Sequence, residues 1–222
     1  MTSLAEIERH IADRHLLKHP FYTAWSRGEL PIETLRSYAG QYYHFEANFP
    51  RYVAAAYARL LRSRDRRVLL ENLIDEEGRA PTHPEMWVDF ARGIGARWPA
   101  RTPPTPFAPT ARLLETYERL TLGPRASPAG ALGALYAYER QFPEVAREKS
   151  RGLRAHYGIS ARPAHEFFRV HTTADVEHAR AEREILRREL AGGGAAPAAA
   201  LAGVDQTLAA WWRFLDGFGI AP

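Results

Sequence analysis

EFFRVHTTADVEHARAE, at residues 166–182, has the hydrophobic spacing of a helix and carries three polar side chains on its apolar face. His171, Asp175 and His178 stand at positions i, i+4 and i+7, within roughly 60° of one another around a helix. Apolar residues continue the same stripe, so it is expected to face the core. Because an unpaired buried charge is costly, the stripe predicts a metal site, a hydrogen-bonded His–Asp–His network or a solvated face.

A second polar interruption lies in RVLLENLIDEEGRAPTHPEMW, residues 67–87. Leu69, Leu73 and Glu76 follow one another at helical spacing, so Glu76 takes a place where an apolar residue is expected. His83 falls in the first turn of the next helix, and a helix–loop–helix corner can bring the two side chains together. The alternative is that Glu76 lies on the surface and His83 caps a helix. The acids on either side of Glu76 are expected to be exposed.

The third interruption lies in ALGALYAYERQFPEVAREKS, residues 131–150. Leu132, Leu135, Glu139 and Phe142 share one helical stripe, so Glu139 is again an acid in an apolar row. It is either a metal ligand or the partner of one of the many arginines.

Together the three segments offer three histidines and three carboxylates, and the chain has no cysteine. Disulfides, thiolate metal sites, iron–sulfur clusters and cysteine nucleophiles are therefore excluded. Imidazole and carboxylate donors suit iron or manganese, and two metal ions about 3.5–4 Å apart need a set of this size. The two Glu-x-x-His repeats of ferritin-type bundles are missing, which disfavours that fold. The candidate metal ligands are Glu76, His83, Glu139, His171, Asp175 and His178.

Helical periodicity runs through almost the whole chain, and strand-like alternation is missing. Four prolines at residues 100–109 indicate an extended crossing. Because candidate ligands fall on both sides of it, we expect residues 1–222 to form one all-α domain. Helices are expected at 4–17, 21–27 (closed by Gly28), 31–61 (kinked at Pro50), 65–77 (capped by Asp65), from Thr82 with a Glu85 capping box, at 110–122, 128–157 and 163–190, and around Trp211 and Trp212.

The composition is that of an ordinary globular protein: 45% of the 222 residues are hydrophobic and 25% are charged. The net charge of +4 is spread along the chain rather than gathered in one patch, so no nucleic-acid partner is expected. No signal-like or membrane-spanning apolar run is visible, which points to a cytoplasmic protein without a membrane partner. Only two of the 30 basic residues are lysines, Lys18 and Lys149.

Taken in order, several motifs resemble those of the haem-oxygenase-like di-metal oxidases, in particular the group named for the chlamydial protein associating with death domains. The resemblance covers most of the chain to about residue 190. The motifs are HPFYTAW (19–25), QYYHFEANFP (41–50), NLIDEEG (72–78), HPEMW (83–87), YERQFPE (138–144), REK (147–149) and HTTADVEH (171–178).

The resemblance implies a haem-oxygenase-like bundle of the TenA/PqqC type, with seven or more helices and the six ligands named above. It also implies two metal ions, Fe/Fe or Fe/Mn, together with molecular oxygen and an external reductant. A homodimer is expected from the family and from exposed aromatic residues such as Trp211 and Trp212. The bridging carboxylate and the electron donor stay open.

The family is similar to a 4-aminobenzoate synthase of folate biosynthesis that consumes its own side chains. The matching positions are Tyr22, as the source of the aromatic ring, and Lys149, as the amino donor. Tyr43 and Tyr138 match other tyrosines near the family's metal site. The alternatives are that Tyr22 is an ordinary core aromatic residue and Lys149 a surface lysine, although the scarcity of lysine favours a function for Lys149.

Two other functions are open. The same centre could oxidise an exogenous small molecule, such as an amino acid or a fatty acid. The family name also suggests a non-enzymatic protein that binds death domains. Glu46, His44 and Arg169 are expected to support the ligands rather than to bind metal. Haem bound through a histidine such as His19 would leave the carboxylates unexplained.

Overall fold

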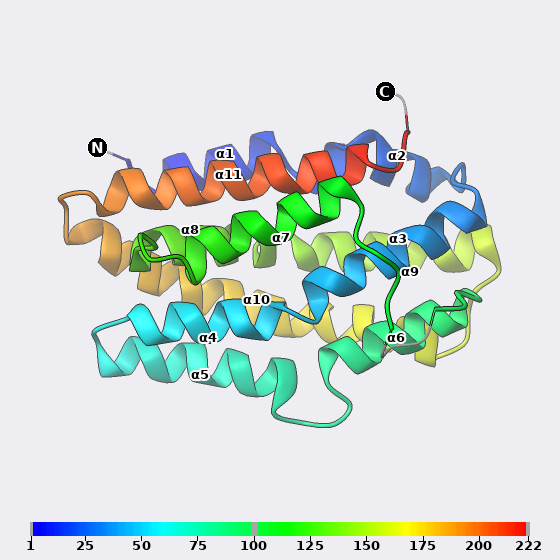
Figure 1. Cartoon of the computed structure of the whole chain (residues 1–222), viewed down its shortest axis with the longest axis horizontal. Coiled ribbons are helices and arrows are strands. Elements are labelled where there is room, and N and C mark those ends of the chain that lie inside the picture. The colour runs from blue at the N-terminus through cyan, green and yellow to red at the C-terminus, as the bar shows by residue number, and fades with distance from the viewer. Residues whose placement is uncertain (1, 99–101, 221–222) are drawn as a thin grey trace.

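The computed structural model describes residues 2–98 and 102–220, and within these ranges every regular element is a helix (Figure 1). A short 3₁₀ helix, η1 (Leu16–Lys18), follows the first α-helix. The α-helices are α1 (Leu4–Asp13), α2 (Pro20–Arg27), α3 (Ile32–Glu46), α4 (Phe49–Arg59), α5 (Ser63–Glu77), α6 (His83–Gly93), α7 (Ala108–Thr121), α8 (Pro128–Glu139), α9 (Phe142–Tyr157), α10 (Pro163–Ala191) and α11 (Ala196–Asp216).

The long helix α10 organises the bundle, because it packs against α9, α6 and α8 and also touches α5 and α11. On the opposite side of α8, α11 runs along α8 and α7, with α1 beside it (Figure 1). Helices α4 and α5 form a hairpin at the lower edge of the view. Helices α5 and α8 thus lie against α10, and α3 packs against α6.

Glycines allow α8 and α11 to approach closely. A Cβ atom on Gly133 would lie 2.4 Å from the carbonyl oxygen of Ala200, and one on Gly203 would lie 2.3 Å from that of Gly130. Real Cβ atoms do not approach backbone oxygen so closely, so these positions need glycine despite its cost within a helix. The close contact holds Trp211 of α11, 1% exposed, in the aromatic core.

Two predicted long helices are each divided into two. The helix expected at 31–61 ends at Glu46, and α4 starts at Phe49 with Pro50 in its first turn. The helix expected at 128–157 ends at Glu139, and α9 starts at Phe142 with Pro143 in its first turn. Proline lacks an N–H and clashes with the preceding turn, so the chain restarts a helix at each proline instead of bending.

Other local predictions are confirmed or corrected. The capping box of Thr82 and Glu85 is present, and Gly28 ends α2 in the left-handed conformation with φ 72°. Asp65 does not cap α5: it is buried and accepts a hydrogen bond from Arg188 at 2.7 Å.

The proline-rich crossing is only partly described, since positions 100 and 101 lie outside the described residues. Residues 102–107 are not helical, and α7 begins at Ala108, slightly before the expected start. The expectation of exposed tryptophans is wrong for Trp211, and Trp212 is partly buried, with its indole N–H donating to the carbonyl of Arg14 at 2.9 Å. No helix in the described ranges has the length and apolar character needed to cross a membrane.

Candidate metal centre

Helix ends bring the polar side chains of the core together. Glu46 and Glu139 are the last residues of α3 and α8, Glu76 is the next-to-last residue of α5, and His83 is the first residue of α6. The C-terminal end of a helix carries partial negative charge, so three such ends favour a cation between them. The middle of α10 adds His171, Asp175 and His178. All seven side chains are buried.

Four of these residues form a first set. Glu46, Glu76, His83 and His171 each offer a ligand atom, and these atoms all lie within 4.8 Å of one another. The Nδ1–H of His83 donates to Glu76 Oε2 at 2.8 Å, and the rings of His83 and His171 are 4.2 Å apart. Glu46 was expected to be a supporting group, but the structure places it among the candidate ligands.

A second set shares Glu76 with the first. Glu76, Glu139 and His178 have ligand atoms within 4.8 Å of one another. Nδ1 of His178 lies 3.8 Å from Glu139 Oε1 and 3.8 Å from Asp175 Oδ1, so Asp175 adjoins this set without belonging to it. Two adjacent sets with one common carboxylate fit a site for two neighbouring metal ions.

Two histidines are oriented by hydrogen bonds from the ring nitrogen that faces away from the sets. Nδ1–H of His171 donates to the carbonyl of Phe167 at 2.7 Å. Nε2–H of His178 donates to Asp75 Oδ2 at 3.2 Å. Each bond leaves the other ring nitrogen free to bind a metal, as is usual for histidine ligands. Asp75 was expected to be exposed, and its side chain is 39% exposed while it still holds His178.

The buried polar atoms fit a pair of metal ions. Within the described part of the chain, Glu46 Oε1, both carboxylate oxygens of Glu139, Asp175 Oδ2 and His178 Nδ1 have no hydrogen-bond partner. Burial raises the pKa of Glu46 to about 8 and that of Glu139 to about 7. Burial also raises the pKa of Asp175 well above its ordinary value. Divalent cations would give these groups partners and allow them to ionise.

One further buried acid was missed from the sequence. Glu182 follows His178 by one helical turn, is 0% exposed, and neither of its carboxylate oxygens has a hydrogen-bond partner among the described residues. Burial, and then the neighbouring charge of Glu139, raise its pKa well above the ordinary value. The spacing of the 166–182 stripe reaches Glu182, so the signal was present.

Lys149 lies beside this centre and is fully buried, with 0% exposure. Its Nζ has no hydrogen-bond partner within the described residues, and it lies 4.6 Å from the centre of the Tyr42 ring and 5.5 Å from that of Tyr22. Burial lowers the pKa of Lys149 well below its ordinary value, which favours the neutral amine. The alternative of a surface lysine is therefore excluded.

Three tyrosines line the space around this amine. The hydroxyl groups of Tyr22 and Tyr38 are 2.9 Å apart and hydrogen bonded. Burial raises the pKa of Tyr22 well above its ordinary value, so its phenol is protonated. The hydroxyl of Tyr42 forms a hydrogen bond with that of Tyr138, which directly precedes Glu139 in the chain.

The structure brings Tyr22, Lys149 and Tyr138 together but places Tyr43 elsewhere. Tyr43 is partly exposed, with its ring 4.9 Å from that of Trp98, and it lines a surface pocket with Glu85. Tyr42 takes the inner position instead. His44 donates to the carbonyl of Pro104 at 2.6 Å, and Arg169 pairs with Glu166 on the surface at 2.6 Å, so neither supports the candidate ligands directly.

Comparison with known proteins gives consistent results. The sequence pattern of a family described as iron-containing redox enzymes matches residues 36–212. A 4-aminobenzoate synthase of Chlamydia pneumoniae is 40% identical over 220 residues, which cover 98% of this chain and 96% of that protein. A 4-aminobenzoate synthase of Nitrosomonas europaea is 37% identical, covering 96% of this chain and 89% of that protein.

Solved structures confirm the predicted fold. A domain from Shewanella denitrificans with a heme oxygenase-like fold has a TM-score of 0.77 at 19% identity, covering 99% of this chain and 93% of its own. A TenA homologue from Pseudomonas syringae has a TM-score of 0.76 at 17% identity, covering 98% of this chain and 93% of its own. The all-α, haem-oxygenase-like architecture of the TenA type is therefore established.

Proposed function

The chain belongs to the family of iron-containing redox enzymes, and we propose that it is an oxygen-dependent two-metal enzyme that forms 4-aminobenzoate for folate biosynthesis from two of its own side chains. The observation that carries this proposal is Lys149, a buried amine without a hydrogen-bond partner among the described residues, held against tyrosine rings beside a two-metal set of ligands. A structural lysine would not be left neutral and unpaired in an aromatic core.

The ligands proposed for the two ions share one carboxylate. Glu76 belongs to both ligand sets; Glu46, His83 and His171 would help to hold one ion, and Glu139, Asp175 and His178 would help to hold the other. The donor set contains no sulfur and accepts either Fe/Fe or Fe/Mn. When bound, the ions would supply the reaction of molecular oxygen with electrons from an external reductant.

Tyr22 provides the carbon skeleton in this proposal. Its side chain, cut between Cα and Cβ, has the ring and the one attached carbon of 4-aminobenzoate, with the phenol oxygen at the position that the amine must take. Tyr38 holds that phenol by the hydrogen bond of 2.9 Å, and both side chains are closed off from water. Because the phenol is held in a fixed position, less entropy is lost when the ring reaches the geometry in which it reacts.

Lys149 provides the nitrogen: the lone pair of its neutral amine would form the bond to the ring carbon that gives up the phenol oxygen, and the Cε–Nζ bond of the lysine would then break. Molecular oxygen would be the oxidant, and the external reductant would supply the electrons. The carboxyl group of Glu46 is close enough for its charge to oppose the lowering of the Lys149 pKa by burial. Glu46 is therefore both a member of the first ligand set and an acid whose negative charge would stabilise the positive charge that the amine develops as it forms a new bond. The second candidate function is the oxidation of an exogenous amino acid or fatty acid, and it requires a route by which that substrate reaches the buried centre. Family membership argues against a non-enzymatic death-domain partner.

Labelling of the lysine nitrogen tests the proposal, because the chain has only two lysines. Protein made with lysine carrying ¹⁵N in its side chain is loaded with iron or with iron and manganese, reduced and exposed to oxygen. We expect labelled 4-aminobenzoate from the wild type and from Lys18→Arg, and none from Lys149→Arg. Unlabelled product, or labelled product from Lys149→Arg, would exclude Lys149 as the donor.

A further inference from the structure

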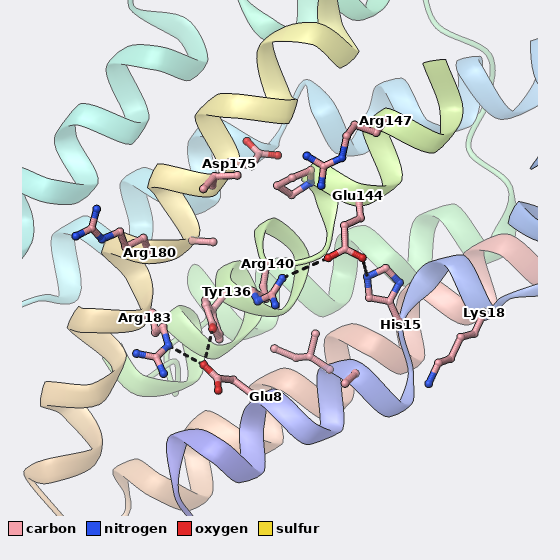
Figure 2. A pocket seen from close by; sticks show the side chains of 15 residues that line it. Glu8, His15, Lys18, Tyr136, Arg140, Glu144, Arg147, Asp175, Arg180 and Arg183 are labelled. Carbon is pink, nitrogen blue, oxygen red and sulfur yellow. Dashed lines mark hydrogen bonds and ion pairs between the residues drawn. The ribbon is translucent and has the colours of Figure 1, made fainter. Parts of the chain in front are cut away.

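The surface pocket next to Asp175 is a separate feature that the self-sacrificing reaction does not itself explain. It has a volume of about 800 Å³ and lies between α1, α9 and α10 (Figure 2). Asp175 is the only one of the proposed metal ligands among its lining residues. Asp175 is 1% exposed, and its Oδ1 lies 3.8 Å from Nδ1 of His178. Asp175 therefore belongs both to the wall of the pocket and to the candidate metal centre.

The pocket has an excess of positive charge. Five cationic side chains line it, against three carboxyl groups. Glu8 is already paired with Arg183 at 2.7 Å, and Glu144 lies between Arg140 at 3.8 Å and His15 at 3.5 Å. The cationic residues are Lys18, Arg140, Arg147, Arg180 and Arg183.

Three of these cations are available to a ligand. Arg147 of α9 and Lys18 of η1 form no ion pair within the described residues, and Arg180 of α10 reaches only the exposed Glu177, at 3.9 Å. Figure 2 shows Arg147 and Asp175 on neighbouring helices at the same end of the pocket. A guanidinium group in this setting recognises a carboxylate by paired hydrogen bonds.

The remaining wall is apolar. Ile11 of α1, Pro143 of α9 and Ala179 of α10 line the pocket, and Val176 is 48% exposed beside them. A pocket of this size with an apolar wall and a few charged groups suits a small organic anion. Metal ions and nucleotides fit it less well, since its carboxyl groups are mostly paired and no glycine-rich phosphate loop is present among its lining residues.

The pocket also adjoins the space around Lys149. Phe142 directly precedes the lining residue Pro143; its ring is 4.9 Å from Lys149 Nζ and 5.3 Å from the His171 ring. The first turn of α9 is therefore the wall between the buried amine and the pocket. A product formed at Lys149 would thus lie one aromatic side chain, Phe142, away from the helix turn that lines this pocket.

We propose that this pocket binds a small aromatic carboxylate, and that it receives the product of the buried site as it leaves. The inference rests on the proposed function, which supplies an aromatic carboxylate. The same cationic and apolar lining would also suit an aliphatic carboxylate that enters from solution as a substrate. The experiment therefore compares the binding of both kinds of carboxylate.

Equilibrium dialysis of the full chain with 4-aminobenzoate, without oxygen, tests this pocket. We expect saturable binding of about one molecule per chain, and a dissociation constant about tenfold higher for the double variant Arg147→Gln/Arg180→Gln, the effect of losing a charge-assisted contact. Arg154→Gln, an exposed arginine on α9 outside the pocket, should leave it unchanged. The neutral 4-aminobenzamide should bind more weakly than the acid.

Several outcomes would overturn the inference. Absence of saturable binding, or equal affinity in the double variant and Arg154→Gln, would exclude the pocket. Tighter binding of hexanoate or lysine than of 4-aminobenzoate would assign it to an incoming substrate instead. A chain that releases 4-aminobenzoate in oxygen but does not bind it would contradict this inference alone. Failure of the proposed function would show separately, as absence of product in the oxygen exposure.

Discussion

The amine of Lys149 lies 5.5 Å from the centre of the Tyr22 ring, and both side chains are buried, with 0% and 2% exposure. The two groups that would supply the nitrogen and the ring are thus already adjacent before any reaction, in a space without water access. This proximity is what a reaction between two side chains of one chain needs, because no substrate has to diffuse in.

Replacing Lys149 by methionine should stabilise the fold. The change removes a buried amine without a partner and keeps a similar apolar shape, so the free energy of unfolding at pH 7 should rise by at least about 2 kcal/mol. Urea unfolding of the metal-free protein measures it. Lys18→Met, at an exposed site, should change it by less than about 0.5 kcal/mol.

The gain from Lys149→Met should also depend on pH. Because burial lowers the pKa of Lys149, the unfolded chain holds a proton that the folded chain lacks up to about pH 10.5. Wild type therefore gains stability relative to the variant as pH rises toward that value. A constant difference between pH 6 and 10 would show that the amine is not buried in its neutral form.

The metal-free Lys149→Met variant, in which the opposing titration of the buried amine is absent, should lose stability between about pH 4.5 and 8. Burial raises the pKa of Glu46 to about 8 and of Glu139 to about 7, so the folded chain holds protons that the unfolded chain has released. The resulting decrease in the free energy of unfolding should exceed about 1 kcal/mol. With metal bound, these carboxylates are already ionised and the decrease should vanish. An equal slope with and without metal would contradict the ligand assignment.

Asp75→Asn should weaken metal binding without touching a ligand. Asp75 accepts the Nε2–H of His178 at 3.2 Å, and loss of such a partner typically costs about 10–100-fold in affinity. Competition with a chelator, read out as metal per chain, measures the change. Glu77→Gln, an exposed neighbour on α5, is the matched control. Equal affinity in the two variants would remove Asp75 from the centre.

Gly203→Ala should destabilise the bundle. The new Cβ would lie 2.3 Å from the Gly130 carbonyl oxygen, so α8 and α11 must separate, at an expected cost of more than about 2 kcal/mol. Thermal and urea unfolding can measure this. The exposed Ala202→Ser should change stability by less than about 0.5 kcal/mol. A neutral effect of Gly203→Ala would mean that the two helices are not so closely packed.

The sequence predicted the helical fold and the buried face shared by His171, Asp175 and His178, because helical spacing alone puts these three residues on one side of a helix. It did not predict Glu46 as a candidate ligand. Glu46 lies at the centre because α3 ends there, before Pro50, where a kink in one continuous helix was expected. The same break follows Glu139, and both acids stand in the pattern Glu-x-x-Phe-Pro. This repetition was a usable signal.

The choice between neighbouring tyrosines needed the structure. Tyr42 and Tyr43 differ by one residue, which is about 100° around a helix, and only the side that faces α6 and α9 reaches Lys149. The stripe of Tyr38, Tyr42 and Glu46, spaced by four residues, runs along that side. The basic pocket could not be foreseen, because its residues come from helices far apart in the chain.

Intact-mass measurement of the metal-loaded chain before and after oxygen exposure tests the central claim most directly. The account predicts a loss of mass that peptide mapping confines to Tyr22 and Lys149, with no more than one 4-aminobenzoate per chain and no added substrate. Tyr22→Phe should show no loss at that position, whereas Tyr43→Phe should react as wild type does. An unchanged chain that forms product in excess, or from an added small molecule, would contradict the account.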